Sequence, residues 1–285
     1  MRSISNGMNK FLILFAVAAL AALLCGPSQG LAAPILGNDL ATFAVLGASG
    51  VTNVATSTIG GNLGSSPNAS VGGGYVFTSG SLQANTALAA SAQLQLDAAI
   101  TTLGLMGPGL TIGSDLTGTI LPGIYTVPAG PTNLSGALIL DGGGSNSAVW
   151  VFQMPSTLIT STTSTVTVQN IGDGANVGIY WNVGTAATLN GPTFEGNVLA
   201  QTLISSDGNL TILNGRLLSA TSQVTLIQDT IALNQCPNSP NSGGYDQGNP
   251  NIPGPPASVP EPATLLLLGS GLVGLVGFGK RFKKA

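Results

Sequence analysis

The chain has 285 residues, with seven Lys and Arg, ten Asp and Glu, and no His. The lack of His excludes Ser-His-Asp and Cys-His nucleophilic sites and removes the imidazole as a metal ligand. Between residues 34 and 236 a single basic residue, Arg216, stands against eight acidic residues, a net charge of −7. Because a body of this sign repels phosphate, we do not expect a nucleic-acid partner.

The first 33 residues have the three-part order of a secretory signal peptide. Arg2 and Lys10 precede an apolar run from Phe11 to Leu24, and small residues follow as far as Ala33. This order predicts export, with cleavage close to the end of the segment. An N-terminal membrane anchor is the alternative interpretation of the same run.

The C-terminal 49 residues, 237–285, divide into two parts. Residues 237–258 are rich in Pro, Asn, Gly and Ser and have no apolar periodicity, so we expect a flexible linker. Residues 259–285 contain an apolar, glycine-containing run followed by a basic tail. The run is near the short limit for a membrane-spanning helix, and the tail predicts a cytoplasmic C-terminus.

The order of Pro260, Glu261 and Pro262, the apolar run and the basic tail resembles the PEP-CTERM sorting signal of Gram-negative bacteria. This resemblance implies processing by an exosortase-type sorting enzyme and contact with the membrane through residues 263–279 before processing. It also implies delivery to the cell envelope surface or the extracellular space, and it raises exopolysaccharide as a further partner.

Residues 81–103 have the periodicity of an amphipathic helix. Apolar residues recur there at steps of three and four: Ala84, Leu88, Ala92, Leu96, Ala99 or Ile100, and Leu103. Gly104 is expected to end the helix. Because the segment has no Lys or Arg, packing against the body is favoured over binding to a membrane surface.

The remainder of residues 34–236 consists of short β-rich groups separated by Gly, Asn, Ser and Pro. Four segments share one pattern, in which a threonine precedes an aliphatic residue: 165–168, 186–189, 209–212 and 223–226. Turns of chain of about 20 residues that stack on one another are typical of a parallel β-helix. A β-sandwich fits the composition nearly as well, and the helix at residues 81–103 favours the β-helix.

Several motifs in this body resemble the ice-binding-like (DUF3494) family. They lie, in order, at residues 36–47, 59–64, 121–125, 148–153, 179–184, 194–200 and 214–218. The resemblance implies a mainly β fold over residues 34–236, a discontinuous right-handed parallel β-helix (solenoid) with one long α-helix packed alongside. It implies ice as the partner and no cofactor.

In a β-helix, side chains on one face of a strand repeat about every 6.6 Å and successive turns lie about 4.8 Å apart. Threonines on such a face form a rigid grid of methyls and hydroxyls that can hold ordered water. The resemblance implies a Thr-Ala/Gly-x-Thr/Asn motif, which residues 185–188 match, whereas residues 207–210 and 221–224 depart from it, with Asp207 and Gln223 on the grid. The candidate ice-binding residues are Thr165, Thr167, Thr185, Thr188, Thr211 and Thr225.

The sequence therefore predicts an exported ice-binding protein, active in antifreeze or inhibition of ice recrystallisation. The alternative is a structural or adhesion protein of the envelope or biofilm that binds polysaccharide or cells. That alternative needs exposed aromatic rings, but Trp150 and Trp181 lie in apolar patterns and are expected in the core. A sugar hydrolase needs paired carboxylates, and Glu195, Asp207 and Asp229 are scattered, so we expect no catalytic residues and no metal ligands.

Overall fold

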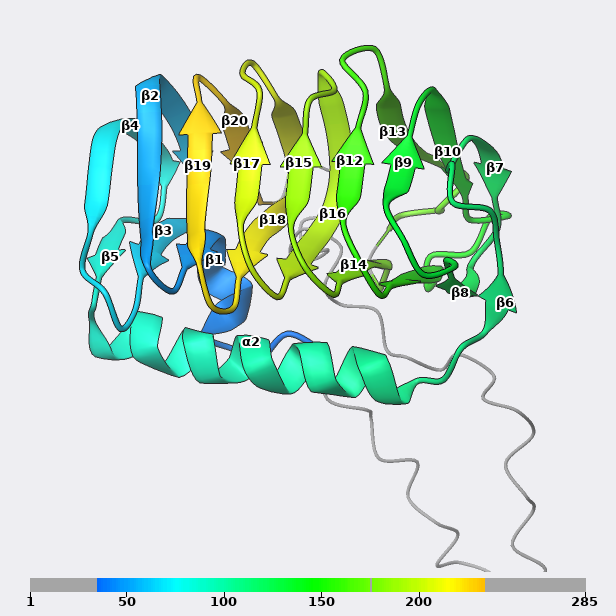
Figure 1. Ribbon diagram of the computed structural model, residues 1–285, viewed down its shortest axis with the longest axis horizontal. Helices are drawn as coiled ribbons and strands as arrows, with labels where there is room; N and C mark the ends of the chain where they lie inside the picture. Colours follow the sequence, from blue (N-terminus) through cyan, green and yellow to red (C-terminus); the bar gives the residue numbers. More distant parts are fainter. Residues whose placement is uncertain (1–34, 175, 234–285) are drawn as a thin grey trace, which may run out of the picture. The chain divides into compact units, whose positions relative to one another are not determined.

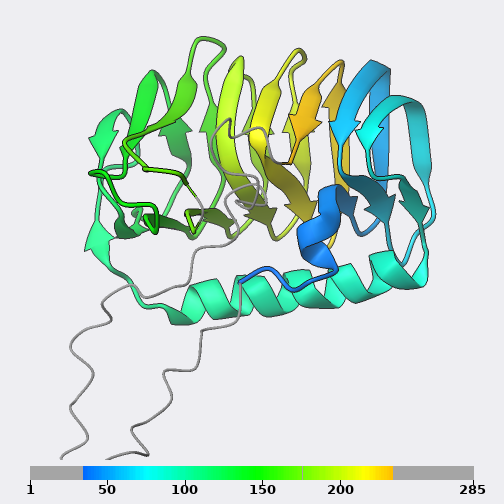
Figure 2. The same cartoon turned by 180° about the vertical axis from the view of Figure 1, so that it is seen from behind.

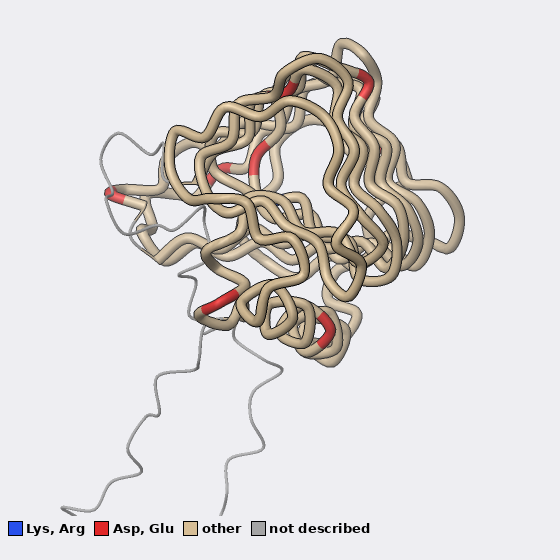
Figure 3. The backbone as a smooth tube through the Cα atoms, turned by 90° about the vertical axis from the view of Figure 1, so that its left-hand side faces the viewer, with Lys and Arg blue, Asp and Glu red and all other residues tan. Residues whose placement is uncertain are grey.

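The structure is a computed structural model that describes residues 35–174 and 176–233. These residues form a solenoid whose parallel strands lie on three faces (Figure 1). Viewed along the solenoid, the stacked turns superimpose as a three-sided ring (Figure 3). The predicted signal peptide, linker and sorting segment lie outside the described residues. Within the described part of the chain, no helix is long and apolar enough to cross a membrane.

The first face, called the front face here, is turned toward the viewer in Figure 1. In stacking order its strands are β9 (Thr132–Leu134), β12 (Leu158–Thr160), β15 (Ala187–Leu189), β17 (Ile204–Ser206), β19 (Gln223–Ile227) and the first residues of β2 (Gly50–Gly60) and β4 (Val71–Ser79). Because side chains alternate along a strand, each strand buries one residue in the core and turns the next one outward.

The second face, called the rear face, lies behind the front face in Figure 1 and toward the viewer in Figure 2. Its strands are β7 (Gly118–Ile120), β10 (Ala137–Asp141), β13 (Thr165–Gln169), the first residues of β16 (Thr193–Ala200) and β18 (Thr211–Ser219), β20 (Thr230–Ala232) and the last residues of β2 and β4. Strands β2 and β4 therefore bend around a corner and belong to both faces.

The third face is covered by the long helix α2 (Ala87–Leu105) and by the short helix η1 (Leu40–Thr42). Its strands are β6 (Leu110–Thr111), β8 (Gly123–Thr126), β11 (Val149–Met154), β14 (Gly178–Val183), the last residues of β16 and β18, β1 (Phe43–Gly47), β3 (Asn62–Ser65) and β5 (Leu82–Ala84). Many outward residues of this face are apolar and pack against α2, among them Val151, Leu199 and Leu218, whereas Gln153 is polar and its side-chain amide donates a hydrogen bond to the Leu103 carbonyl of α2.

The order of turns in space differs from their order in the sequence. Strand β19 pairs with β2, so that Val224 lies beside Val51, and β18 pairs with β1. The C-terminal turns are therefore stacked on the N-terminal ones, and α2 carries the chain from one end of the stack to the other. Nineteen helical residues span about 28 Å, and the six steps between the seven front strands span about 29 Å. The predicted discontinuous β-helix with one helix alongside is confirmed.

The predicted bounds of the helix were wrong at both ends. Residues 82–84 form strand β5, paired with β3, so Ala84 belongs to a strand. The helix starts after Thr86, whose hydroxyl accepts a hydrogen bond from the Ala89 backbone N–H at 3.2 Å and so satisfies one of the free donors of the first turn. Gly104 lies inside the last turn, and the helix ends at Leu105.

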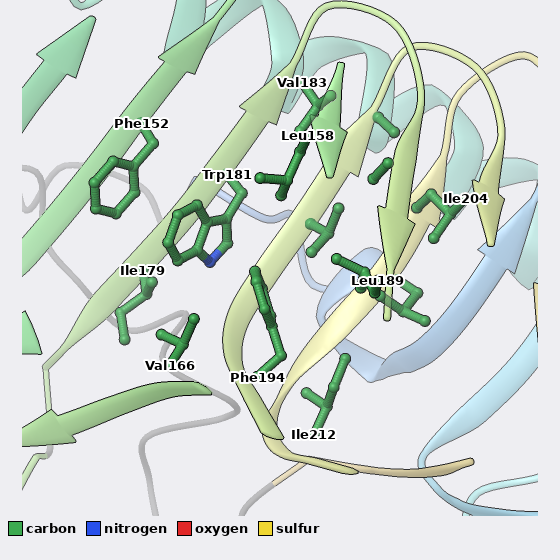
Figure 4. Packing of buried hydrophobic residues seen from close by; sticks show 14 of the residues in the cluster. Phe152, Leu158, Val166, Ile179, Trp181, Val183, Leu189, Phe194, Ile204 and Ile212 are labelled. Atoms are coloured by element: carbon green, nitrogen blue, oxygen red, sulfur yellow. The ribbon is translucent and has the colours of Figure 1, made fainter. Parts of the chain in front are cut away.

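A stack of aromatic rings fills one part of the core. The ring centroids are 5.7 Å apart between Tyr125 and Phe152, 4.2 Å between Phe152 and Trp181, and 4.9 Å between Trp181 and Phe194. Figure 4 shows Phe152, Trp181 and Phe194 following one another on successive turns. Trp150 and Trp181 have no exposed surface, so their predicted burial is confirmed.

The packing of α2 on the third face gives a stability prediction. Leu96 is fully buried in that interface, whereas Leu94, on the same helix, is 73% exposed. We expect Leu96→Ala to lower the free energy of unfolding by about 2–4 kcal/mol and Leu94→Ala to change it by less than about 0.5 kcal/mol. Urea unfolding followed by circular dichroism measures both, and equal losses in the two variants would contradict the packing.

Candidate functional site

The six predicted threonines do not share one face. Thr188 and Thr225 point outward on the front face, on β15 and β19. Thr165, Thr167 and Thr211 lie on the rear face, on β13 and β18. Thr185 lies in the turn that leads into β15, at the corner between the helix-covered face and the front face. The sequence pattern of a threonine before an aliphatic residue therefore occurs in strands of both the front face and the rear face.

A row of paired outward positions runs across the front face, and four neighbouring positions in it carry a Ser or Thr side chain. Residue by residue, the paired outward positions are Asn133, Ile159, Thr188, Ser205, Thr225, Thr52 and Gly72. The Thr52 hydroxyl donates to the Thr225 hydroxyl at 3.2 Å, and the Ser205 hydroxyl donates to that of Thr188 at 3.5 Å. Four successive turns thus present hydroxyls in register, and Ile159 and Gly72 bound the row.

A second front row lies three residues earlier in each turn. Its members are Ser156, Thr185, Thr202, Ser222 and Ser49. Backbone hydrogen bonds hold neighbouring members together: Thr185 N–H donates to Ser156 O at 3.2 Å, Thr202 N–H to Thr185 O at 2.9 Å, and Ser49 N–H to Ser222 O at 3.0 Å. The hydroxyl oxygen of Thr185 is buried, whereas Ser49 is exposed.

The strand pairing corrects the predicted alignment of the Thr-Ala/Gly-x-Thr/Asn motif. Thr188 pairs with Ser205, and Ser205 pairs with Thr225, so the counterparts of residues 185–188 are 202–205 and 222–225. The predicted alignment of 207–210 and 221–224 was wrong. Asp207 follows β17 at the corner and is exposed, and the side-chain amide of Gln223 donates to the Thr225 hydroxyl at 3.4 Å. Residues 49–52, 185–188, 202–205 and 222–225 share a Ser/Thr-x-x-Ser/Thr spacing, which sequence reasoning missed.

A third row, on the rear face, consists of five threonines. The paired positions are Ala137, Thr165, Thr193, Thr211, Thr230, Thr58 and Val76. Each of the five threonines is partly exposed. Thr167 is beside this row and pairs with Ile139 on β10. Sequence reasoning missed Thr58, Thr193 and Thr230, because their strands share no motif that distinguishes them from other threonine-containing strands.

A buried carboxylate fixes the corner between the front and rear faces. Asp229 is 1% exposed and accepts hydrogen bonds from the backbone N–H groups of Leu210 and Ile227, each at 3.0 Å, and from the Ser206 hydroxyl at 2.5 Å. Its own backbone N–H donates to the Ser57 hydroxyl at 2.9 Å. Burial raises the pKa of Asp229 against the opposing effect of these hydrogen bonds. The corner is therefore held by a compact hydrogen-bond network.

The three acidic residues Glu195, Asp207 and Asp229 differ in exposure. Glu195 has one buried carboxylate oxygen without a hydrogen-bond partner, and burial raises its pKa to about 7 although the Asn214 side chain opposes the shift. Asp229 is buried at the corner, and of these three acids only Asp207 is exposed. Within residues 35–174 and 176–233, no group of three or more His, Cys, Asp or Glu side chains could hold a metal ion.

Two parts of the chain match known family models. Residues 45–232 match the model described as ice-binding-like, and residues 258–281 match the PEP-CTERM protein-sorting motif. An ice-binding protein of Nostoc sp. (strain HG1) is 36% identical over 248 residues, which cover 85% of this chain and 86% of the relative. An ice-binding protein of Flavobacterium frigoris (strain PS1) is 28% identical over 216 residues, 68% of this chain and 75% of the relative.

Solved structures show the same architecture. An ice-binding protein from an Antarctic biological consortium superimposes with a TM-score of 0.65 at 31% identity, covering 72% of this chain and 94% of that one. An ice-binding protein of the Antarctic ascomycete Antarctomyces psychrotrophicus superimposes with a TM-score of 0.62, also at 31% identity, covering 68% of this chain and 96% of that one.

The raised pKa of Glu195 predicts a pH-dependent stability. A carboxyl whose pKa rises from 4.5 to about 7 on folding stabilises the fold below pH 4.5, and this contribution is lost as the pH rises through about 7. We expect Glu195→Gln to raise the free energy of unfolding by about 1–3 kcal/mol near pH 8 and to change it little near pH 4. Urea unfolding at both pH values measures the difference.

The matched control is Asp207→Asn, at an exposed carboxylate. It is expected to show no such gain at high pH. If Glu195→Gln changes the free energy of unfolding by the same amount at both pH values, ionisation of Glu195 is not the cause of the gain in stability.

Proposed function

This chain belongs to the ice-binding-like family, and we propose that it binds ice by adsorption through the front face. The observation that carries this proposal is the front row of Thr188, Ser205, Thr225 and Thr52, paired residue by residue across four successive turns. The names of the relatives and structural neighbours support ice as the ligand.

The backbone gives the front row the regularity that a crystal surface requires. Paired parallel strands hold the hydroxyls of neighbouring turns about 4.8 Å apart, close to the oxygen repeat along one axis of hexagonal ice. The threonine methyls limit competing hydration, and the hydroxyls anchor water in an ordered array. Because strand pairing already fixes these side chains, little conformational entropy is lost on binding.

The surroundings of the front row favour an uncharged, flat contact. None of the residues in β9, β12, β15, β17 and β19 is charged. Asp115, which bridges to Asn133, lies at the β9 end, and Asp207 lies at the corner. The active area therefore extends from Thr188 to Thr52, bounded by Ile159 and Gly72.

Adsorption explains how such a face acts on ice without catalysis. Molecules bound to the ice front prevent growth where they sit, so the front advances only between them and becomes curved. A curved front has a lower local freezing point, and growth stops within a range of temperature. No active site is required, and we propose that the protein is not an enzyme.

The ends of the chain support export to the site of action. We propose that residues 1–33 are a signal peptide, residues 34–236 the ice-binding domain, residues 237–258 a linker and residues 259–285 a sorting signal. The PEP-CTERM match at residues 258–281 supports processing by an exosortase-type enzyme, with residues 263–279 contacting the membrane beforehand. The destination is the envelope surface or the medium.

Sugar binding by stacking on Trp150 or Trp181 finds no support, because both rings are buried.

A bulky side chain in the front row tests the proposal. We expect Thr225→Tyr, and likewise Thr188→Tyr, to lower thermal hysteresis and inhibition of ice recrystallisation several-fold, because the ring stands above the flat row. The same substitution at Thr101, an exposed residue of α2, is the control and is expected to leave both activities unchanged. Circular dichroism verifies that each variant is folded, and wild-type activity in both front-face variants would place the ice-binding surface elsewhere.

A further inference from the structure

The rear face carries a longer row of identical residues than the front face. Thr165, Thr193, Thr211, Thr230 and Thr58 pair in register across five turns. We propose that the rear face is a second ice-binding surface, so that one molecule presents two rigid faces to ice. This inference rests on the proposed function of the front face and extends it to a separate set of residues.

The rear row has the chemical properties that support ice binding on the front. Each of its five members supplies a hydroxyl and a methyl, and turns lie about 4.8 Å apart on this face as well. Threonine is common in strands because it is β-branched, but other outward positions of the rear face meet that preference with Ile139 and Val76. Strand propensity alone therefore does not account for threonine at five paired positions.

None of the paired positions of the rear row, from Ala137 to Val76, is charged. Glu195, two residues after Thr193, has one buried carboxylate oxygen and the raised pKa described above. Asp229 directly precedes Thr230 and is 1% exposed. Asp141 lies at the last position of β10, beyond the row. Asp229 is thus directed into the protein and Glu195 is partly exposed, whereas Asp141 and Gln169 form a polar pair at the outer end of β10 and β13, away from the threonines.

The two ends of the rear row differ in how freely an ice surface can approach them. The loops that follow β10 and β13 leave the rear face at the end of the solenoid that contains β7 (Figure 2). Strands β18, β20 and β2 lie farther from those loops. We therefore expect Thr211, Thr230 and Thr58 to contribute most of the contact with ice.

The corner network makes the two faces one rigid unit. Asp229 accepts hydrogen bonds from Ser206 and Ile227, which end front strands, and from Leu210, which directly precedes rear strand β18. Its backbone N–H is held by Ser57, within the strand that serves both faces. The angle between the faces is therefore set by buried hydrogen bonds, and each face can adsorb without rearrangement of the other.

Adsorption of fluorescently labelled full-length protein to a single ice crystal tests the inference. Four proteins are compared: the wild type, Thr225→Tyr on the front, Thr230→Tyr on the rear, and the double variant. We expect each single variant to retain a measurable part of wild-type fluorescence on ice and the double variant to fall to the level of a labelled protein that does not bind ice. Thr101→Tyr, at an exposed residue of α2 outside both rows, is the control and is expected to adsorb like the wild type.

The outcomes separate this inference from the proposed function. If Thr225→Tyr alone abolishes adsorption and Thr230→Tyr adsorbs like the wild type, the front face is the whole site and the second surface is refuted. If the folded double variant adsorbs like the wild type, neither face binds ice. If the wild type itself does not adsorb, the proposed function fails, and the second surface fails with it. Circular dichroism and thermal melts establish that all variants are folded.

Discussion

Parallel backbone pairing between successive turns is the constraint on which the remaining structure depends. It places Thr188, Ser205, Thr225 and Thr52 opposite one another and sets a common distance between them. Since side chains alternate along a strand, the same register stacks the inward residues into a continuous core, in which Phe152 and Trp181 overlap. Surface regularity and core packing are thus two consequences of one hydrogen-bond pattern.

The three faces differ in what lies on their outer side. On one face many of the outward residues are apolar and pack against α2, and the length of the helix matches the stack of turns. The other two faces carry rows of hydroxyls. Strand β2 is central to both, because it supplies Thr52 to the front row and Thr58 to the rear row. The discontinuity in chain order, which places β2 beside the C-terminal strands, therefore extends both surfaces by one turn.

The sequence was sufficient to predict the β-helix, the helix alongside it, the burial of both tryptophans and the family. It was insufficient to assign threonines to faces, because the turns differ in length: the paired residues Leu158, Ala187 and Ile204 are 29 and 17 residues apart. Spacing alone then cannot separate a front strand from a rear strand. Thr52 was missed for another reason, since its partner Thr225 lies 173 residues away in sequence. Ser205 lies between Thr188 and Thr225 in the front row, and only the strand pairing shows this.

The most direct measurement is a high-resolution crystal structure in which the water on the front face is resolved. If the front face holds ice through its hydroxyl rows, ordered waters will lie beside Thr188, Ser205, Thr225 and Thr52, one set per turn, and will repeat with the spacing of the strands. Waters without that repeat, on a front face free of lattice contacts, would contradict the claim that the paired hydroxyls organise water into an ice-like layer.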